Sequence, residues 1–465
     1  MRRLAVALAA SQRAASARTN LRRVSVLAAV VALAGVAASP ARAHAQLEEA
    51  SPAAGAVLDR APETVFVRFT DSVSVVSGSL RVFDSQGRRV DIGTVQKPGD
   101  RELRARLRGG LPDDVYTVAW KAISSDSHPI RGAYAFTVGT RQANTDGIAD
   151  EVFDDESSTA VDAALAITRY LGLALILLCV GGATILAFVV DPPQQRSRVL
   201  WSALAVSAGL LVLASLAWIA LTGVQAVGLG LDAVFTGSLF RDVVETGFGR
   251  AWLIRAVLAA VLAVLAVVSA RRRTERGLVA AVFLASAIGV TPALSGHART
   301  EGVFAMTSDA VHTLAAGAWV GGLAFVSLLL VAAAGDRWSL AASVVPRFST
   351  VALVAVAALV AAGVGNSIVQ VGSMQALWET TYGRLLLAKV ALVVPLLLLG
   401  AYNNRRAVPA LRAGDPPAEL RRRFSRVIAT ELAIMALIVG VTSALVAEPP
   451  ARAQATTSDG EISGG

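Results

Sequence analysis

Charged residues are scarce in this chain of 465 residues, at 17% of the total, whereas soluble proteins contain about a quarter. Hydrophobic residues make up 54%, and the mean hydropathy is +0.58. The apolar residues gather in blocks of about twenty, the length that a helix needs to cross about 30 Å of hydrocarbon. These properties exclude a soluble globular protein and place most of the chain in a membrane.

Cysteine and histidine are also rare. The single cysteine, Cys179, lies inside an apolar block, so the chain has no internal disulfide and no thiolate cluster of the zinc type. There are four histidines: His44, His128, His297 and His312. The sequence shows no nucleotide-binding fingerprint, so we expect any transport to proceed without ATP hydrolysis by this chain.

Basic residues exceed acidic ones, 43 to 34, which gives a net charge of +9. Nearly all are arginines that lie between apolar blocks, where the positive-inside rule assigns them to cytoplasmic loops. The surplus therefore does not indicate binding to nucleic acid.

The first 43 residues have the pattern of a secretory signal peptide. The charged segment Leu21-Arg22-Arg23 precedes an apolar run at 24–38 and an Ala41-Arg42-Ala43 cleavage site. Cleavage there makes His44 the first residue of the mature protein. The pair Arg22-Arg23 leaves both Sec and twin-arginine export open.

The rest of the chain divides into four segments. Residues 44–139 alternate apolar and polar residues between turn signals such as Ser85-Gln86-Gly87, which predicts an antiparallel β-sandwich outside the membrane. Residues 140–162 are expected to form an acidic linker, 163–448 an all-helical membrane domain, and 449–465 a disordered tail.

We predict eight membrane-spanning helices, at about 166–190, 199–227, 250–270, 277–294, 307–334, 348–371, 383–402 and 425–447. An even number places both ends of the membrane domain on one side. With the sandwich outside, the inner loops carry fifteen arginines and the outer loops carry only Arg241, Arg250, Arg299 and Arg384. This distribution predicts a multi-pass protein of the cytoplasmic membrane with its N-terminal domain and C-terminus on the periplasmic or extracellular side.

Two histidines can bind a metal outside the membrane. At the start of the mature chain, His44 offers its α-amino nitrogen and its imidazole together. The second histidine, His128, lies in the segment Ser125-Asp126-Ser127-His128-Pro129. If this segment is extended, Asp126 and His128 project from one face of a strand. An amine, two imidazoles and a carboxylate suit tetragonal Cu(II), and residues 44–139 contain no Met or Cys to favour Cu(I). The alternative is a disordered terminus and a turn motif that bind no metal.

Several motifs of this segment occur together: His44-Ala-Gln-Leu47, Ser51-Pro52-Ala53, Phe69-Thr70-Asp71, Asp126-Ser-His128-Pro129-Ile-Arg-Gly132 and Phe136-Thr-Val-Gly139. With them the domain resembles the bacterial copper-resistance family CopC. The resemblance implies an immunoglobulin-like fold and a Cu(II) site on His44, Asp126 and His128. Because the family often has Glu near the site where this chain has Asp71, Asp71 is carried over only as an axial ligand or as a group behind the ligands.

The membrane half carries a second set of motifs: Ser295-Gly-His297-Ala298, Asp309-Ala-Val-His312 followed by Trp319-Val-Gly-Gly-Leu323, Thr381-Tyr-Gly-Arg384 followed by Lys389, and Asn404-Arg405. It resembles the family CopD, which is associated with moving copper across the inner membrane. The whole chain thus resembles a fusion of CopC and CopD.

Ionisable residues at membrane depth usually line a cavity or a pathway. Here they are Arg169, Arg255, His297, Asp309, His312, Lys389 and Glu431, all but Glu431 in the outer third. His297 closes one span, Asp309 and His312 share a face of the next, and we expect Met306 in the loop between them. Together these four residues form a candidate entrance for Cu(II) or Cu(I).

Other readings of these residues remain open. Gly317, Gly321 and Trp319 fit close helix packing, and Cys179 fits a buried apolar position. Arg169, Arg255 and Lys389 are unfavourable beside a cation unless they are paired. We do not expect Lys389 to pair with Glu431, because the two lie near opposite ends of their spans.

The sequence therefore predicts a non-enzymatic copper homeostasis protein that captures Cu(II) outside the membrane and passes copper to or across it. Its expected partners are copper ions, the lipid bilayer, an outer copper donor and a cytoplasmic acceptor. Two alternatives stay open: a membrane oxidoreductase with haem on His297 and His312, or a copper-binding domain on a membrane anchor.

Overall fold

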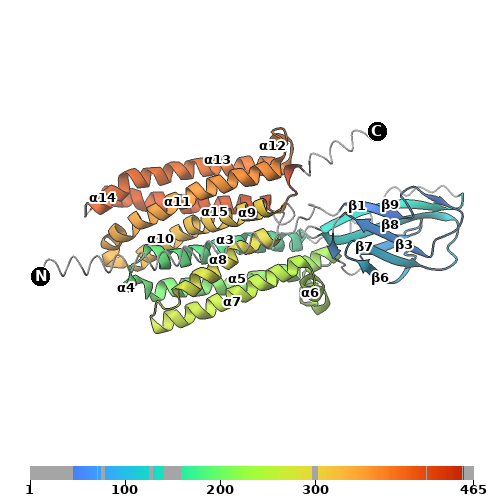
Figure 1. Ribbon diagram of the computed structural model, residues 1–465, viewed down its shortest axis with the longest axis horizontal. Coiled ribbons are helices and arrows are strands. Elements are labelled where there is room, and N and C mark those ends of the chain that lie inside the picture. The colour runs from blue at the N-terminus through green and yellow to red at the C-terminus, as the bar shows by residue number, and fades with distance from the viewer. Residues whose placement is uncertain are drawn as a thin grey trace.

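The computed structural model describes residues 46–70, 72–74, 79–124, 129–140, 159–295, 302–414, 416–452 and 454. The predicted signal peptide, His44, Asp71, Asp126, His128, His297 and most of the predicted linker and tail lie outside these residues. Figure 1 shows a β-domain at one end of a bundle of long helices. Both halves of the predicted fold are confirmed: a β-sandwich followed by a helical domain with eight candidate membrane spans.

The β-domain consists of two sheets. One has the order β1-β3-β7-β6, and the other has the order β2-β9-β8-β4 with β5 also paired to β8. Pairing is antiparallel except between β2 and β9. The strands are β1 (Leu47–Ser51), β2 (Val57–Leu58), β3 (Thr64–Phe69), β4 (Val73–Ser74), β5 (Leu80–Phe83), β6 (Asp91–Gly99), β7 (Glu102–Leu107), β8 (Asp114–Ser124) and β9 (Pro129–Val138).

The alternation of apolar residues explains the core between the sheets. Val65, Val67 and Phe69 of β3 are buried, as are Tyr116 and Trp120 of β8, and all of them belong to one apolar cluster. The alternate residues, Phe66 and Arg68 on β3 and Thr117 and Ala119 on β8, do not belong to this cluster, as the period of two predicts.

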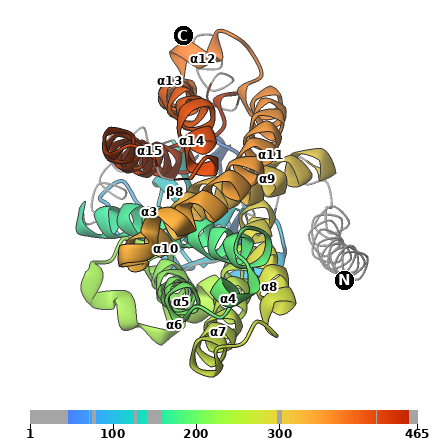
Figure 2. The same ribbon diagram turned by 90° about the vertical axis from the view of Figure 1, so that its left-hand side faces the viewer.

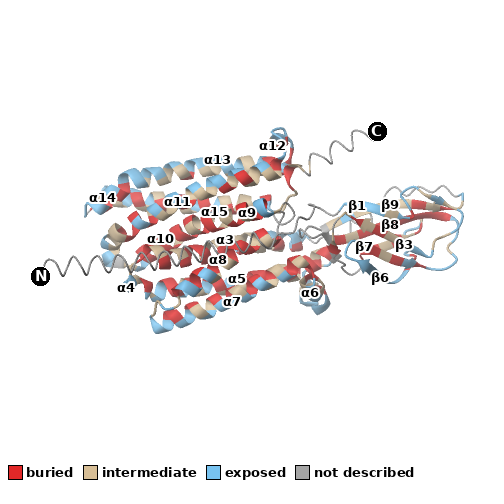
Figure 3. Ribbon diagram, viewed as in Figure 1, coloured by how far each residue is buried: buried red, intermediate tan, exposed pale blue. Residues whose placement is uncertain are grey.

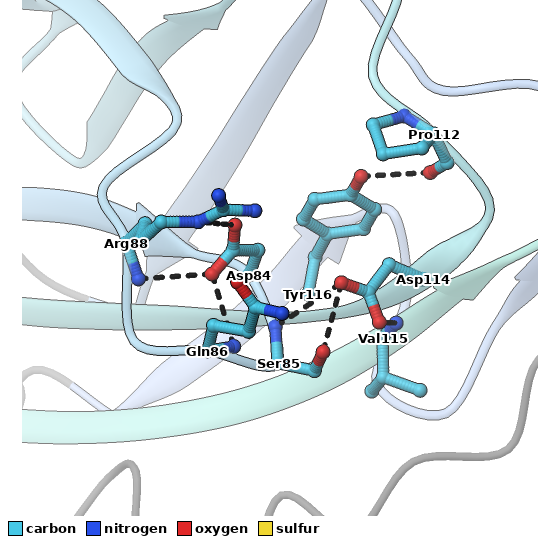
Figure 4. Close-up of polar contacts among 8 residues, drawn as sticks. All are labelled: Asp84, Ser85, Gln86, Arg88, Pro112, Asp114, Val115 and Tyr116. Carbon is cyan, nitrogen blue, oxygen red and sulfur yellow. Dashed lines mark hydrogen bonds and ion pairs between the residues drawn. The ribbon is translucent and has the colours of Figure 1, made fainter.

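A polar cluster closes one end of the sandwich, where β5 ends and β8 begins (Figure 4). The hydroxyl of Tyr116 donates a hydrogen bond of 2.7 Å to the carbonyl oxygen of Pro112. Asp84 accepts hydrogen bonds from the backbone N–H of Gln86 and from the backbone N–H and guanidinium of Arg88. These bonds fix the turn that the Ser85-Gln86-Gly87 signal predicted, in which Gly87 takes a φ of 74°.

The helical domain has eight long apolar segments: α3 with η1 (Thr159–Val189), α5 (Arg198–Val227), α7 (Gly247–Arg272), α8 (Leu278–Ser295), α9 with η4 and α10 (Val303–Ala332), α11 (Arg337–Val371), α13 with η6 and α14 (Thr381–Arg412), and α15 (Ala418–Leu445). Three of them contain a π-helical turn: η1 (Ile185–Val189), η4 (Gly317–Gly321) and η6 (Asn403–Ala407). Between them lie α4 (Pro192–Gln195), α6 (Gly237–Val244) and α12 (Ala376–Glu379), and the 3-10 turns η2 (Leu231–Phe235) and η5 (Ala334–Asp336).

The two ends of the bundle differ. Figure 1 shows α6, α12 and the start of α9 at the end beside the sandwich, where α5 also contacts β8. The turns with α4 and α14, which the sequence assigned to the arginine-rich inner side, lie at the far end. The arginine-poor loops therefore share one end with the sandwich.

Helix α3 lies at the centre of the bundle. It contacts α5, α8, α15 and η4, and Figure 2 shows it between α5 and α7 on one side and α13 and α15 on the other. In its most apolar stretch 67% of the residues are buried, against 6% for α13, and Figure 3 shows this contrast. Much of the α13 surface is therefore available to lipid.

Two expected boundaries are corrected by packing. The predicted linker to residue 162 ends earlier, because α3 begins at Thr159 and its Val161 is fully buried against Val224 and Leu239. The predicted disordered tail does not begin at residue 449. Ala451 is fully buried in a cluster with Tyr382 and Leu445.

Candidate metal centres

The sandwich residues that flank the predicted copper ligands are hydrogen-bonded to one another. The backbone N–H of Thr70 donates to the carbonyl oxygen of Gln46 over 2.9 Å, and the N–H of Gln46 donates to the Thr70 hydroxyl over 3.0 Å. Val73 pairs with Ser124 in the other sheet. The chain entering at residue 46, the crossing between the sheets at residues 70–73 and the end of β8 therefore meet at one end of the sandwich.

The predicted ligands themselves lie outside the described residues. His44 precedes Gln46 by two positions, Asp71 follows Thr70, and Asp126 and His128 belong to the connection between β8 and β9. Within the described ranges there is no group of three or more His, Cys, Asp or Glu side chains placed to hold a metal.

Gly132, which belongs to one of the CopC-like motifs, has a packing role. A Cβ at this position of β9 would fall 2.2 Å from Cζ2 of Trp120, its neighbour on β8. The glycine therefore lets the indole lie across the β8–β9 pair, whose connection carries Asp126 and His128. The ring of Tyr134 also packs beside Trp120, with centroids 6.0 Å apart.

In the membrane domain, Asp309 and His312 lie on α9 (Val303–Ala316), three residues apart on one face. Both are half-buried. Helix α11 closes against this face: the Ser308 hydroxyl donates to the carbonyl oxygen of Ala362 over 2.8 Å, and a Cβ on Gly363 would lie 3.5 Å from Nδ1 of His312. This Nδ1 is buried, and the backbone of Leu359 on α11 lies close enough to interact with the imidazole.

Helix α13 (Thr381–Tyr402) adds Lys389 and Tyr382 to the same region. Lys389 lies within electrostatic range of both Asp309 and His312, and Tyr382 within range of Asp309. The Tyr382 hydroxyl is bonded to the side chain of Gln370 on α11. We call Asp309, His312, Gln370, Tyr382 and Lys389 the outer polar cluster. In it the Lys389 ammonium lies within electrostatic range of the Asp309 carboxylate, the kind of partner that the sequence required for a buried lysine.

Met306 is placed differently from the prediction. It lies in the first turns of α9 and not in a loop, and it is fully buried against Ala305, Leu294 and Val369. It precedes Asp309 by one helical turn. The structure therefore offers its thioether as part of an apolar contact at the edge of the outer polar cluster.

Arg169 and Arg255 are held by aromatic rings. The guanidinium of Arg255, 2% exposed, lies 3.9 Å from the ring centroid of Trp252 and donates to the hydroxyl of Thr291 over 2.6 Å. Trp252 stacks on Trp218 at 4.5 Å, and Arg169 lies 5.2 Å from the Trp218 ring. The two charges are thus stabilised by cation–π contacts across α3, α5 and α7.

Three other residues have the packing roles that the sequence suggested. Cys179 is fully buried and Trp319 is 8% exposed, both in the main apolar core. A Cβ on Gly317 would lie 2.6 Å from Cβ of Val180 on α3, so this glycine permits the close approach of α3 to η4.

Sequence comparison assigns the same two halves. Residues 47–139 match the CopC domain, residues 160–307 the copper resistance protein D-like N-terminal domain, and residues 342–445 copper resistance protein D. The copper transport protein CutJ of Bacillus subtilis (strain 168) is 29% identical over 376 residues, which cover 78% of this chain and 68% of that protein.

Two further matches concern one half each. The inner membrane protein YebZ of Escherichia coli (strain K12) is 31% identical over 260 residues, 55% of this chain and 84% of that protein. The crystal structure of CopC from Methylosinus trichosporium OB3b is 31% identical, covers 22% of this chain and 99% of that chain, and has a TM-score of 0.20.

A CopC-type sandwich joined to a helical domain with eight candidate membrane spans among the described residues defines a multi-pass membrane protein that handles copper. The chain belongs to the copper-resistance family, as a fusion of a CopC domain with a CopD membrane domain.

Sequence reasoning did not find the partners across helices. Gln370 and Tyr382 join the outer polar cluster from α11 and α13, and Trp218 and Trp252 support the arginines. Tyr382 lies in a CopD-like motif, which was the available signal. Nothing in the local pattern around Gln370 or Trp218 marks them, because their contacts depend on how distant helices pack.

Proposed function

We propose that the chain captures Cu(II) on the outer side of the cytoplasmic membrane and passes copper through its helical domain, to or across the membrane. The protein acts as a transfer protein and not as an enzyme. The division into a signal peptide, a sandwich from His44 to Gly139, a linker and a membrane domain belongs to this proposal, with the membrane domain starting at Thr159. The sandwich and both ends of the helical domain then lie outside.

One observation carries the capture step: the segments that bear the predicted ligands flank hydrogen-bonded neighbours at one end of the sandwich. His44 is two residues from Gln46, and Asp71 follows Thr70, which is bonded to Gln46. Since consecutive Cα atoms are about 3.8 Å apart, two residues span less than about 8 Å. Asp126 is likewise two residues from the end of β8. A site of His44, Asp126 and His128, with Asp71 in an axial position or behind it, needs no rearrangement of the strands.

The receiving site in the membrane domain is proposed to use His297, Met306, Asp309 and His312. Asp309 and His312 share the face of α9 that packs against α11, within electrostatic range of Lys389 on α13. Helix α9 begins at the end of the bundle beside the sandwich (Figure 1). Because Nδ1 of His312 faces Gly363, Nε2 is the nitrogen that we assign to copper. Lys389 balances the Asp309 carboxylate until a copper ion takes its place.

The experiment is copper uptake by proteoliposomes that contain the processed protein, with the His44→Ala variant and the double variant Asp309→Asn, His312→Ala. We expect the first to lower uptake at low external copper and the second to lower it at every concentration. Uptake that is indifferent to both variants would contradict the proposal. A haem absorption band in the purified protein would instead favour the oxidoreductase alternative.

A further inference from the structure

Glu431 is a buried carboxyl group that the proposed copper sites do not use. It lies on α15 with 6% of its surface exposed, five residues into the apolar part that follows Arg426, or about 7 Å along the helix. Its polar partner in the structure is Asn403, whose side-chain nitrogen lies 3.3 Å from each carboxyl oxygen. A carboxylate at this depth with only a neutral amide as partner is costly, because nothing balances its charge.

The charged groups of the surrounding helices do not supply that balance. Arg405 and Arg406 of η6 and Arg426 of α15 are exposed. On α3, Arg169 bonds to the carbonyl oxygen of Ser443, twelve residues or about 18 Å along α15 from Glu431. Lys389 precedes Asn403 on α13 by fourteen residues, about 21 Å.

The remaining titratable neighbours are a cysteine and two tyrosines, side chains that carry no positive charge in either protonation state. On α3, Cys179 lies in the apolar core, and Tyr170 lies near Gly440, nine residues along α15 from Glu431. Tyr402 of α13 is exposed, and α10 (Gly322–Ala332) contains no titratable side chain. On α11, the Arg337 guanidinium donates to the Ser425 hydroxyl of α15, six residues or about 9 Å along that helix from Glu431. In the part of the chain that the structure describes, Glu431 therefore forms no ion pair with a cation on any of these helices.

Asn403 supplies a second, independent observation. Its side-chain oxygen is buried and accepts no hydrogen bond. The residue opens the π-helical turn η6, and such turns frequently occur at functional sites. The two carboxylate oxygens of Glu431 and the amide oxygen of Asn403 thus all need hydrogen-bond donors, and the NH₂ group of Asn403 is the donor that the pair itself offers. One added hydrogen removes the mismatch, because a protonated carboxyl donates to the amide oxygen once the amide is turned.

We propose that Glu431 is a proton-binding site of the membrane domain, and that it exchanges its proton as copper passes. The pair Glu431–Asn403 is neutral while the proton is bound. When a copper ion moves along α13 and α15, its charge stabilises the carboxylate, and the proton leaves toward the arginine-rich end of the bundle. One positive charge then leaves the site as another arrives.

The atoms that Glu431 and Asn403 offer as ligands are mainly oxygens, which suit a proton better than soft Cu(I). Only the exchange step rests on the proposed copper passage.

The proton site is tested by infrared spectroscopy of the full-length protein in lipid nanodiscs, with Glu431→Gln, Asn403→Leu and, as a matched control, Glu379→Gln. Glu379 is an exposed carboxyl group on α12 that accepts from Gln375. At neutral pH we expect the C=O band of a protonated carboxyl group, which is lost in Glu431→Gln, shifted in Asn403→Leu and unchanged in Glu379→Gln. No loss of a band in Glu431→Gln, or a band that responds to Na⁺ and not to pH, would overturn the proposal.

The exchange step is tested in proteoliposomes loaded with a pH-sensitive dye. Copper addition should release protons with the wild type and with Glu379→Gln, and this release should be lost with Glu431→Gln. Equal release with Glu431→Gln would overturn the exchange. If no copper enters through the wild type while the infrared band is present, the proposed function and the exchange fail, and the proton site stands on the band alone.

Discussion

Gly321 of η4 and Leu177 of α3 meet at backbone distance: a Cβ on Gly321 would fall 1.9 Å from the carbonyl oxygen of Leu177. The approach is reciprocal, since a Cβ on Gly181 would fall 2.1 Å from the carbonyl carbon of Gly321. Small residues thus allow the central helix to contact the span that carries Asp309 and His312. The position of the outer polar cluster depends on this contact.

Substitution at this contact should destabilise the membrane domain. Gly321→Ala inserts a methyl group against the backbone of α3, and overpacking of this kind costs about 1–3 kcal/mol. The measurement is the melting temperature of the detergent-solubilised protein. The matched control is Gly209→Ala on α5, where a Cβ meets nothing within 4 Å. Equal melting temperatures for the two variants would show that α3 and η4 do not pack as described.

The sandwich should depend on the Tyr116 hydroxyl and not on that of Tyr134. Tyr116 donates to Pro112, and its burial, with Asp114 nearby, raises its pKa to about 12, so it remains a neutral donor. We expect Tyr116→Phe to lower the free energy of unfolding by about 1 kcal/mol, measured by urea denaturation of the isolated domain. The Tyr134 hydroxyl is buried without a partner. Tyr134→Phe should therefore cost nothing, and a larger loss there than at Tyr116 would contradict this account.

The loss of sandwich stability at acid pH should depend partly on Asp84. Burial acts to raise the pKa of Asp84, but hydrogen bonds from Arg88 and Gln86 outweigh it and hold the pKa below its ordinary value of 3.8. A pKa that is lower in the folded state stabilises the fold above the ordinary value, and this stability is lost as the pH falls through the folded pKa. Asp84→Asn should therefore lower the free energy of unfolding at pH 7 and reduce its further loss on acidification.

The control for this pH profile is Asp100→Asn, since the Asp100 side chain is 90% exposed. Urea denaturation at pH 7 and near pH 3 should give the same pH dependence for Asp100→Asn as for the wild type. If Asp84→Asn loses as much unfolding free energy between pH 7 and about pH 3 as the wild type does, Asp84 does not contribute to the acid sensitivity of the sandwich.

The outer polar cluster should control copper movement. Removing a metal ligand should cost at least about tenfold in uptake rate, the scale found for groups that only support ligands. We expect this loss for Asp309→Asn and for His312→Ala in proteoliposomes. Thr307→Ala on the same helix is the control, because the exposed Thr307 hydroxyl donates only to the carbonyl oxygen of Val303. A loss for Thr307→Ala as large as for His312→Ala would indicate a general defect of α9.

Lys389 allows a sharper test of the same cluster. If its ammonium only balances Asp309, then Lys389→Gln leaves the carboxylate free to attract copper. We expect copper binding by the membrane domain to tighten and uptake to slow, because release becomes harder. The measurement is copper retained after dialysis alongside uptake rate. Weaker binding in Lys389→Gln would show that Lys389 supports the site and does not compete for it.

The sequence predicted the elements of this protein better than their contacts. Eight spans and the sandwich follow from residue periodicity, which is a local property. Gly317 and Gly321 could be recognised as a packing motif for the same reason. The partners of Glu431 and Asp309 could not be predicted, because Asn403 and Lys389 come from other helices. The tail was misjudged because the burial of Ala451 depends on Tyr382, about seventy positions earlier.

The central claim is the capture of Cu(II) by the sandwich, and the most direct test is electron paramagnetic resonance during Cu(II) titration of residues 44–139 with a native amino terminus. The account predicts one tight tetragonal site with nitrogen ligands that is lost in His44→Ala and in His128→Ala, and that weakens at acid pH because the amine and imidazoles must lose protons to bind. A site that persists in both variants, or that survives an extra residue before His44, would contradict it.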